Sequence, residues 1–580
     1  MTQSKLISPF DEKTFIGYVL YVSPQQVRVH FPSSSLLKKY NYGGEELNAG
    51  IVGNYVVIEG ENYGFLGKIL EIFVPEKERY ELTEADYQSK DFHPTGRVEV
   101  LLCFDYFKRE IKKGLDQFPS VGSKVFICSA TMIQYFFRNF GQKILDKRKS
   151  DTLFDLARLP QDEGSIIKIS PQAIFGRHAA VVGTTGGGKS FTVAKLIEET
   201  LKHKGKCILI DATGEYKNFD PLTNVSAFVL NQNCHFDYKS LKITDLFPLF
   251  RPSEQVQLPK LQDAIRSLKL VKQLQSKSES DLDANDKIIL GHINSHGFLQ
   301  KSKRARNDFL KCYRKYPQIN DFNVDFDFSS LPFQVKEECI YTSDPQAENN
   351  FGGPNERDLG NCQSLISRIL FVLSDHNFKK ILNIDNSEPD ANNFVGIFTR
   401  FLNDDTKNLL RIGLNKTPFD ANVREIVVNA IGRYILEESR KEVFRNKPII
   451  VFIDEAHQFL NKKIKGEFSY DLELNAFDNI AKECRKYGVF LCLATQMPRD
   501  IPIGTLSQIG TFLTHRLINT HDKEAIESAC SSMNRHVLSF LPILGEGEVL
   551  LMGVDFPMPV ILKIIKPNIE PEYGTPLIFS

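Results

Sequence analysis

Short apolar runs alternate with longer amphipathic stretches along most of the chain, and this alternation predicts a parallel sheet covered by helices. Runs without polar residues are typical of strands that are buried on both faces. We expect strands at residues 179–182, 207–210, 449–453, 489–494, 511–514, 549–552 and 560–565. Helical periodicity predicts helices at residues 256–274, 422–438 and 471–487.

The first 130 residues follow a different pattern. Val27, Val29 and Phe31 alternate with Arg28 and His30, and turn-forming residues separate several short apolar runs. Short strands at this spacing predict a small β-barrel, because closure removes exposed strand edges. The region has no recognisable catalytic constellation, so we interpret it as an assembly or partner-docking module.

These patterns divide the chain into four parts. We expect a barrel at residues 1–130, a connector at 131–164, an α/β core at 165–250 and 441–580, and a largely helical insertion at 251–440. The insertion is inferred because the two halves of the core are separated by far more residues than a few β/α units use.

Composition narrows the choice of partners and compartment. The 580 residues include 72 basic and 72 acidic side chains, so affinity for a nucleic acid must come from a local patch or an assembled ring. The ten cysteines form no C-x-x-C pair, which argues against a disulfide framework or zinc site and favours a reducing, cytoplasmic location. No apolar run approaches the ~18 residues of a membrane span, so we expect no membrane association.

A phosphate-binding motif follows the strand at residues 179–182. The stretch Gly183–Ser190 fits G-x-x-x-x-G-K-[ST], with a strand before it and an amphipathic helix after it. In this context backbone N–H groups close around an anion, Lys189 supplies charge for the β- and γ-phosphates, and Ser190 supplies a hydroxyl for Mg²⁺. The candidate nucleotide-binding residues are Gly183, Thr185, Gly186, Gly187, Gly188, Lys189, Ser190 and Phe191.

Acidic and amide side chains follow three of the other expected strands. Asp454 and Glu455 come directly after residues 449–453, where Asp454 would hold Mg²⁺ and Glu455 would orient or deprotonate a water. Asp211 and Glu215 follow residues 207–210 and are candidates for contact with phosphates or metal, although Asp and Gly could simply form a turn there. Gln496 follows residues 489–494 and could bond the γ-phosphate and the water; a polar strand cap is the alternative.

A basic segment lies within the expected insertion. Residues 301–315 hold seven Lys or Arg side chains and one acid, Asp308. An exposed cationic helix of this kind could follow a phosphate backbone, but an ordinary solvated surface explains the same composition.

Several motifs taken together resemble the HerA branch of the HerA/FtsK ATPases. They are Phe175-Gly176-Arg177-His178, the loop 183–190, Asp211-x-x-Gly214-Glu215-Tyr216, Asp454-Glu455-Ala456-His457, Glu483-Cys484-Arg485-Lys486-Tyr487-Gly488, Ala494-Thr495-Gln496 and Gly547-Glu548. The resemblance implies an α/β fold with a RecA-like P-loop core, an N-terminal small β-barrel and a helical insertion. It also implies a homohexameric ring that hydrolyses ATP with Mg²⁺ at subunit interfaces and translocates double-stranded DNA.

The resemblance further implies an effector partner and the roles of two arginines. A NurA-like nuclease or a sirtuin-type effector would dock at the barrel, in DNA repair or in bacterial antiphage defence. Arg485 matches the arginine finger that enters the neighbouring subunit's site, and Arg177 matches a second interface arginine. Gln496 takes the sensor position. The residue before the finger is Cys484, where the family usually has glycine.

A second function fits the same motifs. The chain could form a scaffold ring that ATP switches between states, so that it assembles and regulates the effector without moving far along DNA. Duplex DNA should accelerate ATP turnover by a translocase, whereas a scaffold should respond mainly to its partner.

Overall fold

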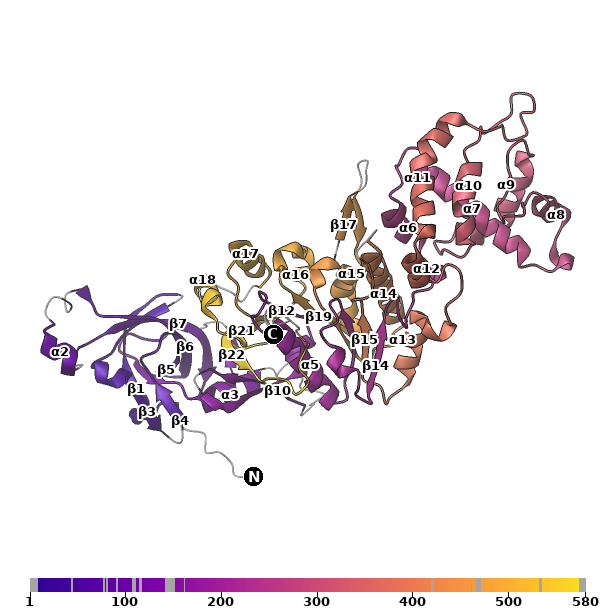
Figure 1. Cartoon of the computed structure of the whole chain (residues 1–580). Coiled ribbons are helices and arrows are strands. Elements are labelled where there is room, and N and C mark those ends of the chain that lie inside the picture. Colours follow the sequence, from indigo (N-terminus) through magenta and orange to yellow (C-terminus); the bar gives the residue numbers. More distant parts are fainter. Residues whose placement is uncertain are drawn as a thin grey trace, which may run out of the picture. The chain divides into compact units, whose positions relative to one another are not determined.

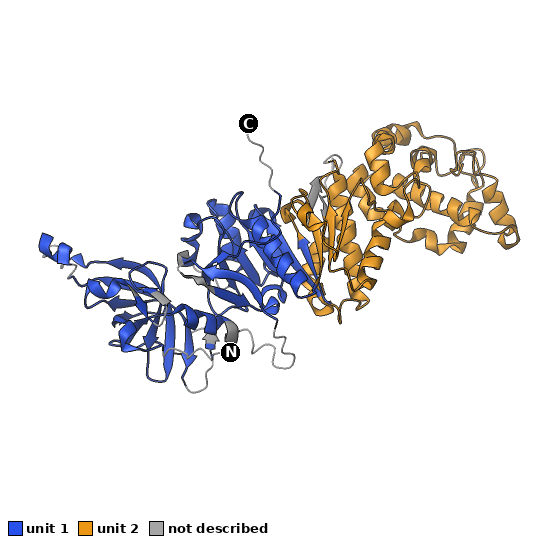
Figure 2. Cartoon of the chain, turned by 60° about the horizontal axis from the view of Figure 1, so that its bottom comes forward, with its two compact units in different colours: residues 1–205, 448–452, 489–580 blue, residues 206–447, 453–488 orange. Residues whose placement is uncertain are grey.

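The structure is a computed structural model. It describes residues 9–24, 26–42, 45–76, 79, 82–89, 92–106, 111–113, 117–140, 152–160, 162–418, 422–460, 462–465, 471–530 and 535–572. These residues form two compact units (Figures 1 and 2). Unit 1 comprises residues 1–205, 448–452 and 489–580, and unit 2 comprises residues 206–447 and 453–488.

Unit 1 begins with a closed barrel. Its strands are β1 (Phe15–Val22), β2 (Gln26–His30), β5 (Tyr55–Glu59), β6 (Tyr63–Phe73), β7 (Thr95–Asp105) and β9 (Lys124–Ile127). They follow the order β2-β1-β9-β5-β6-β7, and pairing of β2 with β7 closes the circle. Val27 and Val29 are buried inside, while the guanidinium of Arg28 lies 5.5 Å from the ring centre of Tyr21 outside. The expected barrel is therefore confirmed.

Smaller elements accompany the barrel. They are the hairpin β3 (Lys39–Tyr42) and β4 (Glu45–Asn48), the strand β8 (Ile111–Lys113), which pairs with β7, and the helices α2 (Glu84–Ser89) and α3 (Ala130–Phe140). The middle of the expected connector, residues 141–151, lies outside the described residues.

The rest of unit 1 is a mixed sheet with helices. Its strands are β10 (Phe154–Leu159), β11 (Asp162–Ile169), β12 (Ala179–Val182), β19 (Val489–Thr495), β20 (Thr511–Thr514), β21 (Glu548–Gly553), β22 (Val560–Ile564) and most of β16 (Ile449–Ile453). The order is β11-β10-β22-β21-β20-β12-β19-β16, with β12 parallel to β19 and β20. The helices are α4 (Pro171–Phe175), α5 (Lys189–Lys202), α16 (Ile503–Leu506), α17 (Thr520–Ala529) and α18 (Arg535–Leu538).

β10 and the first three residues of β11 lie in the stretch that we expected to be the connector. β10 and β11 pair with each other, and β10 pairs with the C-terminal strand β22. The sheet therefore starts before residue 165. The domain boundaries themselves stay a prediction.

Unit 2 contains a parallel sheet of three strands. These are β13 (Lys206–Asp211), β15 (Leu409–Gly413) and β14 (Val225–Val229), in that order. β15 falls inside the stretch that we expected to be an insertion, and the sequence analysis did not mark it. Arg411 stands in the middle of this strand, and a charged residue is typical of an exposed segment, but its side chain is buried here.

Helices make up most of the remainder of unit 2. They are α6 (Ile243–Phe250), α7 (Gln257–Gln275), α8 (Ala284–Leu290), α9 (Arg306–Lys315), α10 (Leu331–Glu337), α11 (Glu356–Ser374), α12 (His376–Leu382), α13 (Phe394–Asn403), α14 (Val423–Arg440) and α15 (Ala476–Glu483). Helices α7, α8 and α9 share an apolar cluster, which includes Leu270, Ile289 and Phe309, and α10 and α11 lie beside them (Figure 1). None of the described helices combines the length and apolar character that a membrane crossing requires.

One helix begins later than expected. The prediction at residues 471–487 is wrong over its first turn, because β18 (Asp471–Leu474) pairs with β17 (Lys462–Lys465) as a hairpin. The helix α15 starts only at Ala476, and residues 484–487 form a separate 3₁₀ turn.

The basic segment at residues 301–315 is not a uniform cationic helix. Lys301 is buried and its Nζ lies 2.7 Å from Oε2 of Glu338. Lys315 pairs with Asp283 and Asp286 at 2.7 and 2.6 Å. The exposed basic residues without such pairs in the described chain are Lys303, Arg304, Arg306 and Arg314. Part of the segment's charge is therefore structural.

The fold class is the predicted one. The chain has a closed N-terminal barrel, an α/β core with a glycine-rich loop after β12, and a largely helical segment within unit 2.

Candidate active site

The phosphate loop joins β12 to α5 in unit 1. Gly186 and Gly188 have φ angles of 76° and 103°, which side chains with a Cβ rarely adopt. Gly188 is the N-cap of α5, so the first free N–H groups of the helix follow directly after the loop. This is the backbone arrangement that binds a phosphate at a helix N-terminus.

The helix after the loop is held by its apolar face. Val193, Ala194, Leu196 and Ile197 are buried on this side, and no proline or internal glycine interrupts the helix. Lys189 is the first helical residue and is itself buried. Ser190 follows it and is half-buried, and Phe191 is next in the first turn. The helix thus places the charge of Lys189 at its positive end.

Gln496 lies beside the loop. It follows β19, and its Oε1 accepts a hydrogen bond of 2.6 Å from the hydroxyl of Thr185. The loop is also tied to its neighbouring strands, because the N–H of Gly183 donates to the carbonyl of Thr495 at 3.3 Å. Unit 1 therefore brings together the predicted loop residues and the predicted sensor.

Arg177 lies away from this group. It precedes β12, whereas the loop follows β12, so the two are at opposite ends of the same strand. Its Nε is 3.1 Å from Oδ2 of Asp555, and its side chain is 42% exposed. Arg177 is thus not placed to reach the loop of its own subunit.

Sequence reasoning missed His515, which lies under the loop. It follows β20 directly and is fully buried. Its imidazole contacts Thr192 of α5 and the backbone of Glu548. The available signal was the one that marked Gln496: a polar residue just past a buried strand.

The predicted acidic residues lie in unit 2. Asp454 and Glu455 follow β16, and both side chains are buried. The N–H of Asp454 donates to the carbonyl of Ile210 at 3.0 Å, which fixes its position beside the end of β13. The hydroxyl of Thr213 lies 3.4 Å from Oδ2 of Asp454. A second oxygen ligand is therefore available next to this carboxylate.

Glu455 has an unusual backbone. Its φ of 46° is in the left-handed region, which is uncommon for a residue other than glycine, asparagine or aspartate. Its Oε2 lies 3.4 Å from Nδ1 of His457. Such conformations cost about 1–3 kcal/mol and concentrate at functional sites. The strain gives Glu455 a structural mark that the sequence does not show.

Asp211 has a structural role. Its Oδ1 accepts from the N–H of Gly214 at 2.7 Å, and its Oδ2 accepts from Tyr216 at 3.2 Å and from Arg411 at 2.8 Å. Burial raises the pKa of Asp211, while Arg411 and the two amides oppose the rise. The carboxylate organises the turn, as the alternative interpretation proposed, and its contact with a nucleotide stays a prediction.

The same turn carries Glu215, which is half-buried. Gly214 allows the turn with a φ of 86°, and the carbonyl of Ala212 accepts a hydrogen bond of 2.7 Å from Arg424. The turn is therefore rigidly held, although nothing in its contacts assigns Glu215 a ligand.

Arg485 lies on the 3₁₀ turn after α15 and is exposed. Its guanidinium makes no ion pair or hydrogen bond within the described part of the chain, whereas Arg440 nearby pairs with Glu483 at 2.9 Å. Cys484 points inward and its Sγ lies 3.2 Å from the hydroxyl of Ser439. The unusual cysteine thus anchors the turn and leaves the arginine outside.

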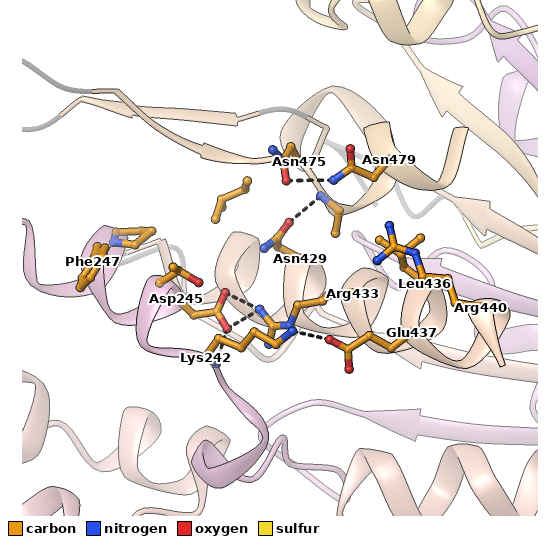
Figure 3. Close-up of a pocket in the computed structure, with 14 residues that line it drawn as sticks. Lys242, Asp245, Phe247, Asn429, Arg433, Leu436, Glu437, Arg440, Asn475 and Asn479 are labelled. Atoms are coloured by element: carbon orange, nitrogen blue, oxygen red, sulfur yellow. Dashed lines mark hydrogen bonds and ion pairs between the residues drawn. The ribbon is translucent and has the colours of Figure 1, made fainter. Parts of the chain in front are cut away.

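Unit 2 also has a cavity of about 570 Å³ among α6, α14 and α15 (Figure 3). Arg433 Nη1 lies 2.7 Å from Oδ1 of Asp245, and Lys242 pairs with Glu437, both across its wall. None of the predicted site residues lines it. Arg440 lines the cavity as well and pairs with Glu483 at 2.9 Å, so each charged side chain on the wall has a partner of opposite sign.

Comparison with known proteins places the chain near one family. Residues 154–335 match the model described as Helicase HerA, central domain. A probable helicase of Methanocaldococcus jannaschii is 22% identical over 97% of this chain and 90% of that protein. The DNA double-strand break repair helicase HerA of Saccharolobus solfataricus is 31% identical over 67% of this chain and 64% of that protein. VirB4 of Thermoanaerobacter pseudethanolicus has a TM-score of 0.43 with 13% identity, over 72% of this chain and 97% of that one.

Proposed function

From the premise that this chain is a HerA-type ATPase, we propose that it is a motor that hydrolyses ATP to move double-stranded DNA. The observation that carries the ATPase assignment within the chain is the loop Gly183–Ser190. Gly186 and Gly188 have positive φ angles, which let the backbone curve around a phosphate, and Lys189 stands at a helix N-terminus, where a phosphate binds. The named relatives are helicases, which supports coupling of hydrolysis to DNA.

The residues fit a nucleotide with Mg²⁺. The loop offers backbone N–H groups and Lys189 to the phosphates, and Ser190 and Asp454 are the oxygen ligands proposed for the metal. No cluster of three or more His, Cys, Asp or Glu side chains in the described chain could hold a metal alone. This agrees with Mg²⁺, which is usually held by one or two protein groups together with substrate phosphates and waters. Bound there, Mg²⁺ would neutralise charge on the phosphates.

The other residues take roles that match their surroundings. Glu455 would orient or deprotonate the attacking water, since it is a buried carboxylate held in a strained backbone. Gln496 would bond the γ-phosphate, because it already contacts the loop at Thr185. Nucleotide would have to compete with that contact, which links occupancy of the loop to the position of Gln496.

We further propose a homohexamer in which Arg485 acts on the neighbouring subunit's nucleotide. The support is that Arg485 is exposed and makes no side-chain ion pair within the described chain. A finger arginine in that position would stabilise charge on the transferring phosphoryl group. Arg177, at the far end of β12 from the loop, is a second candidate for an interface.

The barrel is the proposed docking site of an effector, either a NurA-like nuclease or a sirtuin-type enzyme. Leu20 and Tyr21 of β1 and Val121 before β9 are exposed by 51, 52 and 68%. Exposed apolar side chains of this kind are common at interaction sites. The work could serve DNA repair or antiphage defence, and co-purification with the products of neighbouring genes tests the partner.

DNA-stimulated turnover tests the proposed function. Steady-state ATP hydrolysis should rise when linear duplex DNA is added, and the stimulation should weaken as salt increases, because phosphate contacts release counterions. Lys189→Ala should abolish turnover with and without DNA. Turnover that ignores DNA but responds to the effector would favour the scaffold function instead.

A further inference from the structure

His515 joins the phosphate loop to two strands of the sheet. Its Nδ1 lies 2.8 Å from the carbonyl oxygen of Glu548, at the start of β21. Its Nε2 lies 2.8 Å from the hydroxyl of Thr192, in the first turns of α5. One buried ring therefore spans from the end of β20 to both the helix after the loop and the next strand.

The hydrogen-bond partners of His515 define which ring nitrogen carries the proton. A carbonyl can only accept, so Nδ1 must carry the hydrogen that it donates to Glu548. Burial lowers the pKa of His515 to about 4, although the carbonyls of Glu548 and Gly187 oppose the change. The ring is therefore neutral near pH 7, and Nε2 accepts a hydrogen bond from the Thr192 hydroxyl.

Three loop glycines lie against the side chain of His515. A Cβ on Gly183 would lie 2.6 Å from the Cβ of His515, and a Cβ on Gly187 would lie 3.4 Å from the same atom. A Cβ on Gly188 would lie 3.3 Å from Cε1 of His515. The His515 side chain, its Cβ as well as its ring, thus fills the space that the glycines leave on the inner side of the loop.

Arg516, which follows His515, binds the loop through its backbone carbonyl. The N–H and the hydroxyl of Thr184 both donate to the carbonyl of Arg516 at 3.2 Å. The end of β20 therefore holds Thr184 through the backbone of Arg516, and holds the start and the end of the loop through the side chain of His515.

We propose that His515 is a positioning residue for nucleotide binding, which fixes the loop glycines and the first turns of α5 through Thr192. The inference rests on the proposed function, since it concerns ATP on that loop. His515 itself lies beneath the loop and supplies no contact to the phosphates. Its effect is to hold the backbone of the loop in one conformation before ATP arrives, which lowers the cost of ordering that backbone on binding.

The test measures ATP affinity in the full-length chain carrying Glu455→Gln, which blocks hydrolysis. Thr192→Val removes the hydroxyl and keeps the shape of the side chain, and His515→Asn keeps a donor near Nδ1 but cannot reach Thr192. We expect each to raise the Kd for Mg²⁺·ATP about tenfold. The double variant should bind ATP as tightly as the weaker-binding single variant, because both changes remove the same hydrogen bond.

Thr511→Val is the matched control. Thr511 is a fully buried threonine at the other end of β20, and its hydroxyl donates to the carbonyl of Ala173 at 3.0 Å. It should lower the thermal midpoint as Thr192→Val does and leave the Kd unchanged. A general loss of stability would move both threonine variants alike, whereas a positioning role moves the Kd of only one.

The outcomes distinguish a failure of this inference from a failure of the proposed ATPase function. If the Glu455→Gln parent does not bind ATP, the proposed function fails. If the parent binds ATP and Thr192→Val binds equally well, His515 has no positioning role. If the increase in Kd of the double variant equals the product of the two single increases, the inference is also overturned, because the two residues would then act separately.

Discussion

Replacing Arg411 by methionine should loosen the turn that follows β13. The guanidinium of Arg411 is 3% exposed and lies 2.8 Å from Oδ2 of Asp211, which is fully buried. It also contacts both carboxylate oxygens of Asp220 at 2.6 Å. Removing one partner of a buried ion pair costs about 3–5 kcal/mol, because the other charge is left without compensation.

Hydrogen–deuterium exchange of residues 206–216 measures this loss locally. A cost of about 3 kcal/mol predicts exchange that is more than about 100-fold faster in Arg411→Met, since each 1.4 kcal/mol is tenfold. Exchange is preferable to a global unfolding curve, because a chain with several folded parts does not unfold in one step.

The loss should depend on pH in a defined direction. Without Arg411, burial should raise the pKa of Asp211 further above its unfolded value near 3.9, so the folded state binds the extra proton. Arg411→Met should therefore lose stability as the pH rises from the unfolded pKa of Asp211 through its raised folded pKa. The loss of stability relative to wild type should be larger at pH 8 than at pH 5. Asp211→Asn in the same chain should restore most of the protection at pH 8. An equal deficit at both pH values, or no rescue by Asp211→Asn, would refute the reasoning.

Three further predictions concern other parts of the chain. Arg485→Ala should be inactive alone but should regain partial turnover when mixed with Lys189→Ala subunits; no rescue at any ratio would mean that the arginine acts within its own subunit. Glu455→Gly should abolish turnover yet slow hydrogen–deuterium exchange of residues 449–460 about fivefold relative to Glu455→Gln, because glycine relieves the strain of the φ of 46° by about 1 kcal/mol; faster exchange would contradict the strain. His515 has a pKa near 6.5 in the unfolded chain and about 4 in the folded chain. The folding stability of wild type should therefore fall by about 3 kcal/mol relative to that of His515→Asn as the pH drops from 6.5 to 4, and acid denaturation of the two chains measures this difference.

The strands that the sequence located well are those buried on both faces. The expected strands at residues 179–182 and 449–453 have the bounds found in β12 and β16, because a continuous apolar run marks where burial starts and stops. The sequence failed where a charge is neutralised by a distant residue. β15 was missed because Arg411 pairs with Asp211, 200 positions earlier, and Lys301 looked exposed because Glu338 is 37 positions later.

The site followed the same rule. Motifs single out the loop, the acidic pair and Gln496, since each requires particular residues next to a strand end, and the structure has them at strand ends while their roles stay predictions. His515 escaped because its partner Thr192 is 323 positions away, and only the fold joins them. The exposure of Arg485 also came from the structure, because a single sequence cannot separate a free arginine from one in a surface ion pair.

ATP turnover with and without linear duplex DNA tests the central claim most directly. The purified chain should hydrolyse ATP faster when duplex is present, with stimulation that falls as salt rises and disappears in Lys189→Ala. A turnover rate that is identical with and without duplex, at every salt concentration and protein concentration, would contradict a DNA motor.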